Sequence, residues 1–421
     1  MRRLACLLGL RARLLDTRSP ISLGHVGLAK GSDQRCFDVV VVGAGPAGAG
    51  AATWMARWGL GVALLDKSSF PRDKCCGEGL TANALRELAC LGVDLASLPS
   101  FAPIGGVLLR SPRGRVAWVE FGTDPLYAAV ARRYELDAAV VEAARGAGAS
   151  LLLGEEVLGL EEHGSLLRVI TAKGGALEAP VVVAADGAWS RIAKLSGVEA
   201  QRRLVGTDWH GFRCYAEGAS RLGGKMWVFF ERFFLPGYAW AFPLGDGTVN
   251  VGFGALYRGR PIRLASALDV VGRHGGLNEV LGSARPLGAW RSWPIPSHLW
   301  LGPLTARGGR VLFVGDAAGA ADPMSGEGIG RALMTGRFGA QAVAESLSGR
   351  SAPGGRYSQL VREAFRWDDW VNLRARRVLS SEGGVEVALR ACAPNRRLGK
   401  AFGRWLVEDF PRARGLRPWR R

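Results

Sequence analysis

The sequence has no long apolar run and no cysteine pattern that would mark it as membrane-spanning, disulfide-rich or zinc-binding. It contains no stretch of about 18 or more uncharged apolar residues, so no transmembrane helix is expected. Its seven cysteines include only one close pair, Cys75 and Cys76. Because no spacing resembles a zinc site or a disulfide framework, we expect a reducing, cytoplasmic environment and no metal ion.

Acidic residues are also scarce, and the surplus of basic residues lies near the two ends. The formal net charge is +18, of which residues 1–36 carry +5 and residues 350–421 carry +10. Such ends bind anionic lipid or nucleic acid, or only keep a protein soluble. Because no recognition pattern accompanies them, no nucleic acid is expected. Trp405, Phe410 and Trp419 stand among the C-terminal arginines, which favours peripheral binding at the inner face of the membrane.

Residues 1–35 carry no motif. They are rich in Arg, poor in acidic residues and precede the first predicted strand, so an extension without fixed structure is expected over 1–36. One interpretation is a transit peptide, and the other is a start codon assigned too far upstream. The sequence leaves both open, and we favour the second.

From residue 37 onward, strand and helix patterns alternate. Residues 37–42, 47–58 and 62–65 predict a buried strand, a helix and a second buried strand, which together make one βαβ unit. Residues 203–256 instead show short aromatic-rich segments separated by glycine turns, which predict an antiparallel sheet. The sequence thus predicts an α/β fold with a Rossmann-type domain, an antiparallel-sheet substrate domain and a C-terminal helical region.

A glycine-rich turn, Gly43-Ala44-Gly45-Pro46-Ala47-Gly48, joins the first strand to the first helix. Gly43 permits the tight turn, Gly45 lets a pyrophosphate approach the backbone, and Gly48 lets helix and strand pack closely. The helix N-terminus then offers free N–H groups to the phosphates. Asp66, followed by Lys67, ends the second strand, where a carboxylate accepts ribose hydroxyls. An acid at this position disfavours a phosphorylated ribose, so FAD or NAD fits better than NADP.

Two later segments suit a flavin. Gly315 and Asp316 follow a predicted strand at 311–314, where a carboxylate beside small residues can bind a ribityl hydroxyl. The run Gly326-Glu327-Gly328-Ile329 then opens a helix. Its exposed N–H groups can stabilise negative charge on a reduced flavin ring, although an ordinary helix cap would look the same.

Together with Asp186 and Gly187, these runs resemble the three FAD signatures of hydroxylase-type flavoprotein monooxygenases. A closer resemblance is to the geranylgeranyl reductase family, and it rests on residues 70–80, 236–252 and 323–329. This resemblance implies an FAD enzyme that reduces C=C bonds of an isoprenoid by hydride transfer from reduced flavin. It also implies NAD(P)H or ferredoxin as a transient electron donor.

The resemblance further implies roles for single residues in the loop 70–80. Cys76 falls on the family's loop cysteine near the flavin, whereas Cys75 replaces the usual proline. Glu78 is a candidate proton donor, and Arg133 matches an arginine that contacts FAD. The plainer interpretation of Cys76 is a small buried apolar residue.

Residues Tyr238, Trp240 and Phe242 are candidates for an apolar substrate pocket, because they recur in the family's aromatic strand. Trp240 and Phe242 alternate with alanine, so they could equally be plain core. We expect residues 37–200, apart from substrate-domain strands near 101–125, and residues 301–350 in the FAD-binding domain. Residues 201–300 would form the substrate domain and residues 351–421 the helical region.

Two other functions remain open. One is an oxygen-using monooxygenase or flavin-dependent halogenase acting on an apolar or aromatic metabolite. Halogenases carry a Gly-Trp-x-Trp-x-Ile-Pro element, of which residues 237–243 lack the first Trp and the Ile, so the reductase fits better. The other is a membrane-associated FAD protein without catalysis, which requires a blocked pocket.

Overall fold

The computed structural model describes residues 34–198, 208–219, 222, 224–256, 264–265, 268, 276–392 and 396–413. Most of the expected N-terminal extension, and Trp419, lie outside the described residues. The described fold begins earlier than the expected residue 37, because Gln34–Cys36 form strand β1 and pair in parallel with β12 (Ala176–Ala179).

A six-stranded sheet lies at the centre of the nucleotide-binding part. Its order is β19–β20–β13–β2–β3–β9, and all neighbours are parallel except β19 and β20. Its strands are almost entirely apolar and buried, which is typical of a parallel sheet that is covered on both faces. The strands are β2 (Val39–Val42), β3 (Val62–Asp66), β9 (Ser150–Leu153), β13 (Val181–Ala184), β19 (Thr305–Ala306) and β20 (Val311–Phe313).

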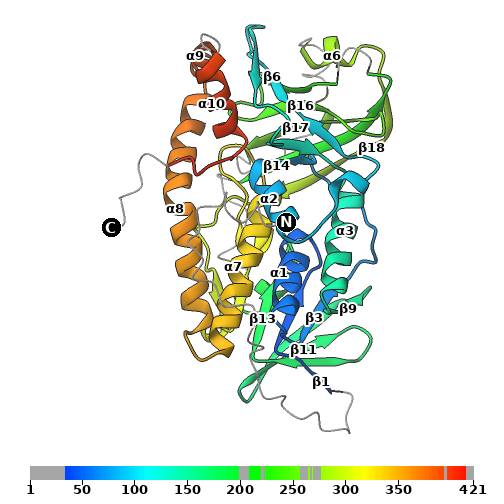
Figure 1. The fold of residues 1–421 in the computed structure, drawn as a ribbon, viewed down its shortest axis with the longest axis vertical. Coiled ribbons are helices and arrows are strands. Elements are labelled where there is room, and N and C mark those ends of the chain that lie inside the picture. Colours follow the sequence, from blue (N-terminus) through cyan, green and yellow to red (C-terminus); the bar gives the residue numbers. More distant parts are fainter. Residues whose placement is uncertain are drawn as a thin grey trace. The chain divides into compact units, whose positions relative to one another are not determined.

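Three helices lie against this sheet: α1 (Pro46–Arg57), α3 (Arg133–Gly146) and α7 (Ile329–Leu347) (Figure 1). Helices α1 and α7 are far apart in sequence but pack closely, because Gly336 of α7 lies against Ala47. A Cβ added at Gly336 would lie 2.3 Å from the Ala47 carbonyl oxygen. This contact brings the first and last cofactor motifs of the sequence together.

A seven-stranded sheet forms the second layer, and Figure 1 shows it above the parallel sheet. Its order is β18–β14–β17–β16–β15–β6–β7, and only β15 and β6 are parallel. It therefore joins strands from residues 106–120 to strands from residues 209–295. The strands are β6 (Gly106–Arg110), β7 (Val116–Glu120), β14 (Trp209–Glu217), β15 (Met226–Phe229), β16 (Tyr238–Pro243), β17 (Val249–Leu256) and β18 (Arg285–Ile295).

Two small sheets complete the strands. One contains β1, β12, β11 (Leu166–Thr171) and β10 (Val157–His163), and the other contains β4 (Gly79–Leu80), β8 (Ala128–Val130) and β5 (Ala102–Ile104). The remaining described helices are α2 (Ala82–Cys90), α4 (Arg191–Leu195), α6 (Gly276–Leu281), α8 (Pro353–Leu379), α9 (Glu382–Cys392) and α10 (Arg396–Leu406).

Thr81 caps the start of α2, because its hydroxyl accepts a hydrogen bond from the Ala84 N–H. At the other end of the chain, α9 and α10 pack against β7, so the C-terminal helices cover one side of the seven-stranded sheet. None of the helices in the described ranges combines the length and hydropathy needed to cross a bilayer.

A chain that begins at Gln34 should keep its FAD and its thermal stability, because every described strand and helix remains. A chain that begins at Val39 loses β1 and its pairing with β12, and should melt several degrees lower. Flavin absorbance and thermal denaturation of the two truncated chains check this. Loss of flavin from the chain that begins at Gln34 would contradict it.

Candidate functional site: nucleotide cradle and apolar cavity

The first glycine-rich turn has the geometry of a phosphate cradle. Gly43 has φ of 101°, and a Cβ there would lie 2.3 Å from the Ala185 carbonyl oxygen. At Gly48 a Cβ would lie 1.8 Å from the carbonyl oxygen of Gly43, so helix and strand approach too closely for a side chain. At Gly45 the nearest atom would be Arg72 Nη2 at 3.6 Å. The position of Gly45 is therefore open on the side where a phosphate would approach.

Helix α1 also leaves its N-terminus free for an anion. Its N-cap is Gly45, which provides no side-chain cap, and Pro46 occupies the first turn. The uncapped N–H groups and the helix dipole together attract negative charge. Asp66 lies beside this turn, where its Oδ2 accepts a 2.8 Å hydrogen bond from the Ala44 N–H. Lys67, next in sequence, is exposed.

The Asp186–Gly187 segment is connected to the same turn. A Cβ at Gly43 would lie 2.8 Å from the Asp186 backbone nitrogen, so the two segments are in contact. Gly187 has φ of 84°, a conformation that favours glycine. The Asp186 carboxylate accepts hydrogen bonds from the Ser190 hydroxyl at 2.6 Å and the Ile192 N–H at 2.9 Å, which cap α4. Burial raises the pKa of Asp186, whereas these hydrogen bonds lower it.

Asp316 and the loop before α7 form the other side of the cradle. A Cβ at Gly328 would lie 3.8 Å from Asp316 Oδ1, and one at Gly315 would lie 2.9 Å from Ala47 Cβ. Gly326 has φ of 71°, and Ile329 is buried at the start of α7. Asp316 forms an ion pair of 2.9 Å with Lys74, from the cysteine loop. The structure thus brings together segments near residues 43–48, 74 and 315–329.

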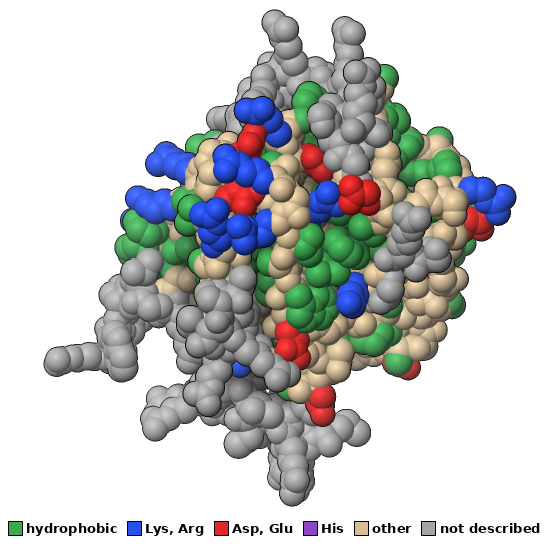
Figure 2. All heavy atoms as spheres, turned by 90° about the horizontal axis from the view of Figure 1, so that it is seen from above, with side chains coloured by type: hydrophobic (Ala, Val, Ile, Leu, Met, Phe, Trp, Pro, Cys, Tyr) green, Lys and Arg blue, Asp and Glu red, His purple; other side chains and the backbone are tan. Residues whose placement is uncertain are grey.

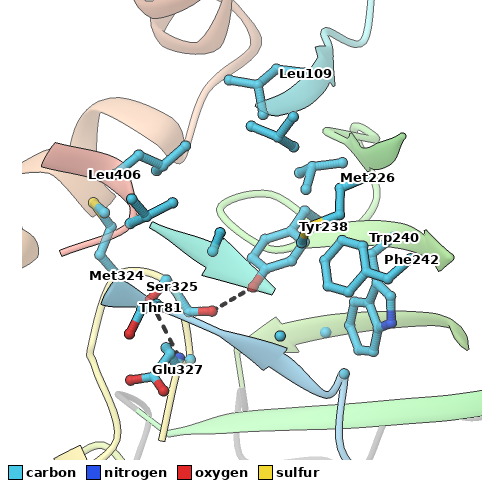
Figure 3. A pocket seen from close by; sticks show the side chains of 18 of the residues that line it. Thr81, Leu109, Met226, Tyr238, Trp240, Phe242, Met324, Ser325, Glu327 and Leu406 are labelled. Carbon is cyan, nitrogen blue, oxygen red and sulfur yellow. Dashed lines mark hydrogen bonds between the residues drawn. The ribbon is translucent and has the colours of Figure 1, made fainter. Parts of the chain in front are cut away.

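A cavity of about 460 Å³ extends from this cradle to the C-terminal helices. Its lining is mostly apolar, and Figure 3 shows side chains from the sheet facing side chains from the C-terminal segment across it. Cys76, Glu78 and the loop 324–329 line one end. The walls come from β6, β16 and the three C-terminal helices, and include Val107, Leu109, Tyr238, Trp240, Phe242, Leu379, Leu389 and Leu406.

Hydrogen bonds fix two aromatic side chains of strand β16, those of Tyr238 and Trp240. The Tyr238 hydroxyl donates a 2.6 Å hydrogen bond to the Ser325 carbonyl oxygen, drawn in Figure 3. The Trp240 indole N–H donates to Asn250 Oδ1 at 2.8 Å, and a Cβ at Gly252 would lie 2.2 Å from this ring. Trp240 and Phe242 are therefore fixed side chains of the cavity wall.

Glu78 lies at the end of the cavity, and its carboxylate is held by three donors. Its Oε1 accepts hydrogen bonds from the Tyr215 hydroxyl at 2.6 Å and the Arg133 N–H at 3.1 Å, and its Oε2 accepts one from the Asn250 amide at 2.8 Å. Glu78 has φ of 64°, an unusual conformation for a non-glycine residue. Burial raises the pKa of Glu78, while these three donors lower it. The contacts are those of an acceptor that positions Asn250 and Tyr215.

The two loop cysteines are both half-buried thiols. Burial raises the pKa of Cys76, although the Arg133 guanidinium opposes this, and burial raises the pKa of Cys75 to about 12. Both side chains therefore stay neutral near pH 7. Cys76 lines the cavity, whereas the Cys75 thiol donates to the Arg291 carbonyl oxygen. Arg133 itself is buried in a bidentate ion pair with Asp137, at 2.6 and 2.8 Å.

The comparisons with known proteins agree with this geometry. Residues 36–223 match the family model described as an FAD binding domain. The chain is 34% identical to the menaquinone reductase of Mycobacterium tuberculosis over 328 residues, covering 73% of this chain and 76% of that protein. It is 32% identical to digeranylgeranylglycerophospholipid reductase 2 of Methanopyrus kandleri, covering 79% of this chain and 82% of that protein.

The chain belongs to the geranylgeranyl reductase family of FAD-dependent oxidoreductases. The resemblance found in the sequence is thereby confirmed, as are the α/β fold and the FAD cofactor.

Solved structures show the same fold. A geranylgeranyl bacteriochlorophyll reductase-like protein from Thermoplasma acidophilum matches with a TM-score of 0.77 and 21% identity, over 89% of this chain and 98% of that one. The halogenase PltM, solved with phloroglucinol and FAD, matches with a TM-score of 0.67 and 17% identity, over 89% and 83% of the two chains. The fold is therefore shared by reductases and halogenases.

Several residues that organise this reductase-family site were not identified from the sequence. Asn250 connects Trp240, Glu78 and the Cys76 carbonyl oxygen, and Tyr215 reaches Glu78 from β14. In the sequence, Asn250 is a polar residue between two valines on a buried strand, within the segment 236–252 that carries the family resemblance. Trp405 was expected at a membrane interface, but it is half-buried and lines the cavity, because α10 turns this side chain inward.

Gly45→Val should abolish the yellow colour of the protein without unfolding it. The added side chain has room beside Arg72, but it occupies the open side of the turn where the pyrophosphate would lie. We expect FAD affinity to fall at least about tenfold, which corresponds to roughly 1.4 kcal/mol. Flavin fluorescence titration and circular dichroism check this, with Gly355→Ala, where a Cβ meets no atom within 4 Å, as the control.

Proposed function

We propose that this protein reduces C=C bonds of an isoprenoid chain, such as that of a polyprenyl quinone or lipid. The observation that carries the proposal is the apolar cavity of about 460 Å³, which ends at the cofactor loops. A polar or charged substrate would leave its groups unpaired against this lining, whereas an isoprenoid chain would bury apolar surface there. The names of the relatives, which include a menaquinone and a lipid reductase, support the same substrate class.

The bound FAD would supply the hydride. The residues that fit it are those of the cradle: Gly43, Gly45 and Gly48 for the pyrophosphate, Asp66 for the ribose, and Asp316 for the ribityl chain. The N-terminus of α7 would face the ring with the N–H groups around Gly326, Glu327 and Gly328. Lys67, Arg133, Asp186 and Gly187 complete the proposed set, with Arg133 and Asp186 acting through the loops they hold.

The protein itself orients the alkene and excludes water. Trp240 and Tyr238 form a rigid wall, and this wall with the apolar lining would hold the double bond in one place near the flavin ring. An isolated alkene is a poor hydride acceptor, so this alignment and a well-placed proton donor are the main contributions of the chain. Cys76 touches the same end of the cavity as a neutral thiol, and Glu78 fixes its loop.

A monooxygenase or halogenase is the second candidate, because halogenases share the fold at TM-scores near 0.67. The strand that these enzymes would use differs here: Tyr238 stands where the halogenase element has its first Trp, and its hydroxyl is engaged by Ser325. Oxygen consumption coupled to product formation would favour this candidate over the reductase.

The decisive experiment is anaerobic. Reduced holoenzyme should be reoxidised by menaquinone or geranylgeranyl lipid in detergent, and the isoprenoid chain of the product, not the quinone ring, should gain two hydrogens per turnover. NADH, NADPH and ferredoxin tested as reductants identify the donor, for which we propose NAD(P)H or ferredoxin. If the reduced flavin is reoxidised by oxygen but by neither isoprenoid substrate, the reductase proposal is overturned.

Leu109→Trp should change the preference of the enzyme toward substrates with a shorter isoprenoid chain. Leu109 is buried in β6 and lines the cavity away from the cofactor loops, so a larger ring fills space that a long chain needs (Figure 3). We expect kcat/KM for the longest polyprenyl substrate to fall at least about tenfold, with a much smaller effect on a short prenyl substrate. Leu301→Trp, at a side chain that is 62% exposed, is the control. Equal losses for both substrates would contradict this use of the cavity.

We also propose that the protein takes this substrate from a membrane surface at the end where α8 meets α9. Val378, 51% exposed, lines the cavity and also faces solvent, and Val387 of α9 is 62% exposed. Arginines 374, 377 and 390 are exposed beside them. Seen from above, Lys and Arg side chains gather on the side of α9 and α10 (Figure 2). Arginines attract anionic headgroups, each with about 1 kcal/mol near the surface.

Binding to anionic liposomes should be strong at low salt and should weaken as salt rises, whereas neutral liposomes should bind little. Exchanging Arg374 and Arg377 for Ser should lower anionic binding several-fold, because two of the exposed charges at this end are lost. Arg145→Ser, on the exposed surface of α3, is the control. Co-sedimentation across a salt series measures it, and equal binding to both liposome types would count against it.

A further inference from the structure

Two carboxyl groups that no step above has used meet beneath the cofactor loops. Glu327 belongs to the loop before α7, and its Oε1 accepts a 2.8 Å hydrogen bond from the Gly330 N–H. Its other oxygen, Oε2, is buried and has no hydrogen-bond partner among the described residues. Glu408 follows α10 and is only 7% exposed. A buried carboxylate oxygen without a donor is costly, whereas a protonated one is not.

Thr81 contacts Glu408 directly and lies near the start of α7, where Glu327 is bound. Its hydroxyl donates to Glu408 Oε2 at 3.3 Å, and it lies 3.4 Å from the position that a Cβ would take on Gly330, the residue that binds Glu327. Figure 3 shows the Thr81 hydroxyl and the Glu327 carboxyl on the same side of the loop. Thr81 and Glu327 both line the large cavity, and Glu408 lies behind them.

A second cavity, of about 170 Å³, lies on the far side of Glu408. Its polar lining includes Arg331, Asn372 and Arg412, and exposed Pro411 stands at its edge. Arg331 is 4% exposed, and its Nη1 has no partner within the part of the chain that the structure describes. Polar cavities of this size hold several water molecules, each of which fills roughly 30 Å³. Such water would connect Glu408 to solvent.

The charges around this pair favour a bound proton. Four buried carboxyls, those of Asp322, Glu327, Asp369 and Glu408, surround the two buried guanidiniums of Arg331 and Arg412. Half-buried Arg376 and Asp368 add one charge of each sign at the edge. Two carboxyls are therefore in excess. The two that have no guanidinium within 3.2 Å are Glu327 and Glu408.

We propose that Glu327 donates the proton that completes alkene reduction, and that Glu408 and the second cavity return a proton to it from solvent. This inference rests on the proposed function. One alkene carbon receives hydride from the reduced cofactor, and the O–H bond of Glu327 breaks as its proton moves to the other carbon. The alkene thus gains two electrons and two hydrogens, the cofactor is oxidised, and the Glu327 carboxylate takes up a proton through Glu408.

The pH dependence follows from the groups that face Glu327. Burial, Glu408 and Asp322 together raise its pKa to about 8, against the Gly330 N–H and Arg331, which lower it. The Tyr238 phenol, from β16, interacts with the same carboxyl. Because the donor must be protonated, the rate of alkene reduction should be high below about pH 8 and should fall as pH rises through this pKa.

Glu327→Gln keeps the acceptor for the Gly330 N–H but has no acidic proton. In single turnovers of the reduced holoenzyme with menaquinone or geranylgeranyl lipid at pH 7, it should slow alkene reduction about 100-fold or more, with flavin content unchanged. Glu408→Gln removes a negative charge that raises the pKa of Glu327. The pH at which the rate of alkene reduction falls should therefore be lower in this variant. Glu87→Gln, which removes a carboxylate paired with Arg337 between α2 and α7, is the control and should leave rate and profile unchanged.

Infrared difference spectra separate this inference from the proposed function, because they need no substrate. The holoenzyme titrated across the pKa of about 8 should lose the C=O stretch of a protonated carboxyl group, and Glu327→Gln should lack this band. Absence of the band in the wild-type protein, or a wild-type turnover rate in Glu327→Gln, would overturn the inference. A protein that shows the band but reduces no alkene would instead overturn the proposed function and, with it, the role as donor to an alkene.

Discussion

The buried carboxylate of Asp322 connects the parts on which the site depends. It accepts hydrogen bonds from the N–H groups of Met324 and Ser325, which shape the loop before α7. Its other oxygen contacts Asn372 of α8 at 2.5 Å and Arg412 at 2.7 Å. Burial opposes ionisation of Asp322, but its arginine neighbours hold its pKa below the usual value. A buried charge of this kind is tolerated only when it is paired, so the cofactor loop and the C-terminal segment are held together.

The contacts of Asp322 with Asn372 and Arg412 explain which segments form the walls of the cavity. Arg412 fixes the segment after α10 against α8 and the loop before α7, and α10 in turn brings Trp405 and Leu406 into the cavity lining. The substrate space is therefore not made by the antiparallel sheet alone. The same contacts of Arg412 hold Glu408 next to Thr81. The segment that forms part of the cavity wall therefore also provides the proposed route for protons.

The shared fold and the sequence identity to known proteins give different information about the chemistry of this protein. A fold shared with halogenases, at 17% identity, would leave the chemistry open. Identities of 34% and 32% over most of the chain to two reductases establish the family. The structure adds to this the network of Glu78, Asn250 and Trp240 at one end of the cavity, and the buried carboxyls of Glu327 and Glu408 near the loop before α7.

The sequence by itself determined the FAD-binding part. Gly43, Gly48 and Asp66 act through local backbone geometry, at the end of one strand and the start of one helix, and short-range patterns report such geometry directly. The alternation of Trp240 and Phe242 on a strand could not say whether their inner face met core or empty space. That depended on α8, α9 and α10, more than 100 residues later in the chain. The partners of Glu78, Glu327 and Arg412 could not be predicted either, because contacts between distant segments produce no characteristic residue spacing in the sequence. Only the packing of the elements decides which buried charges come into contact.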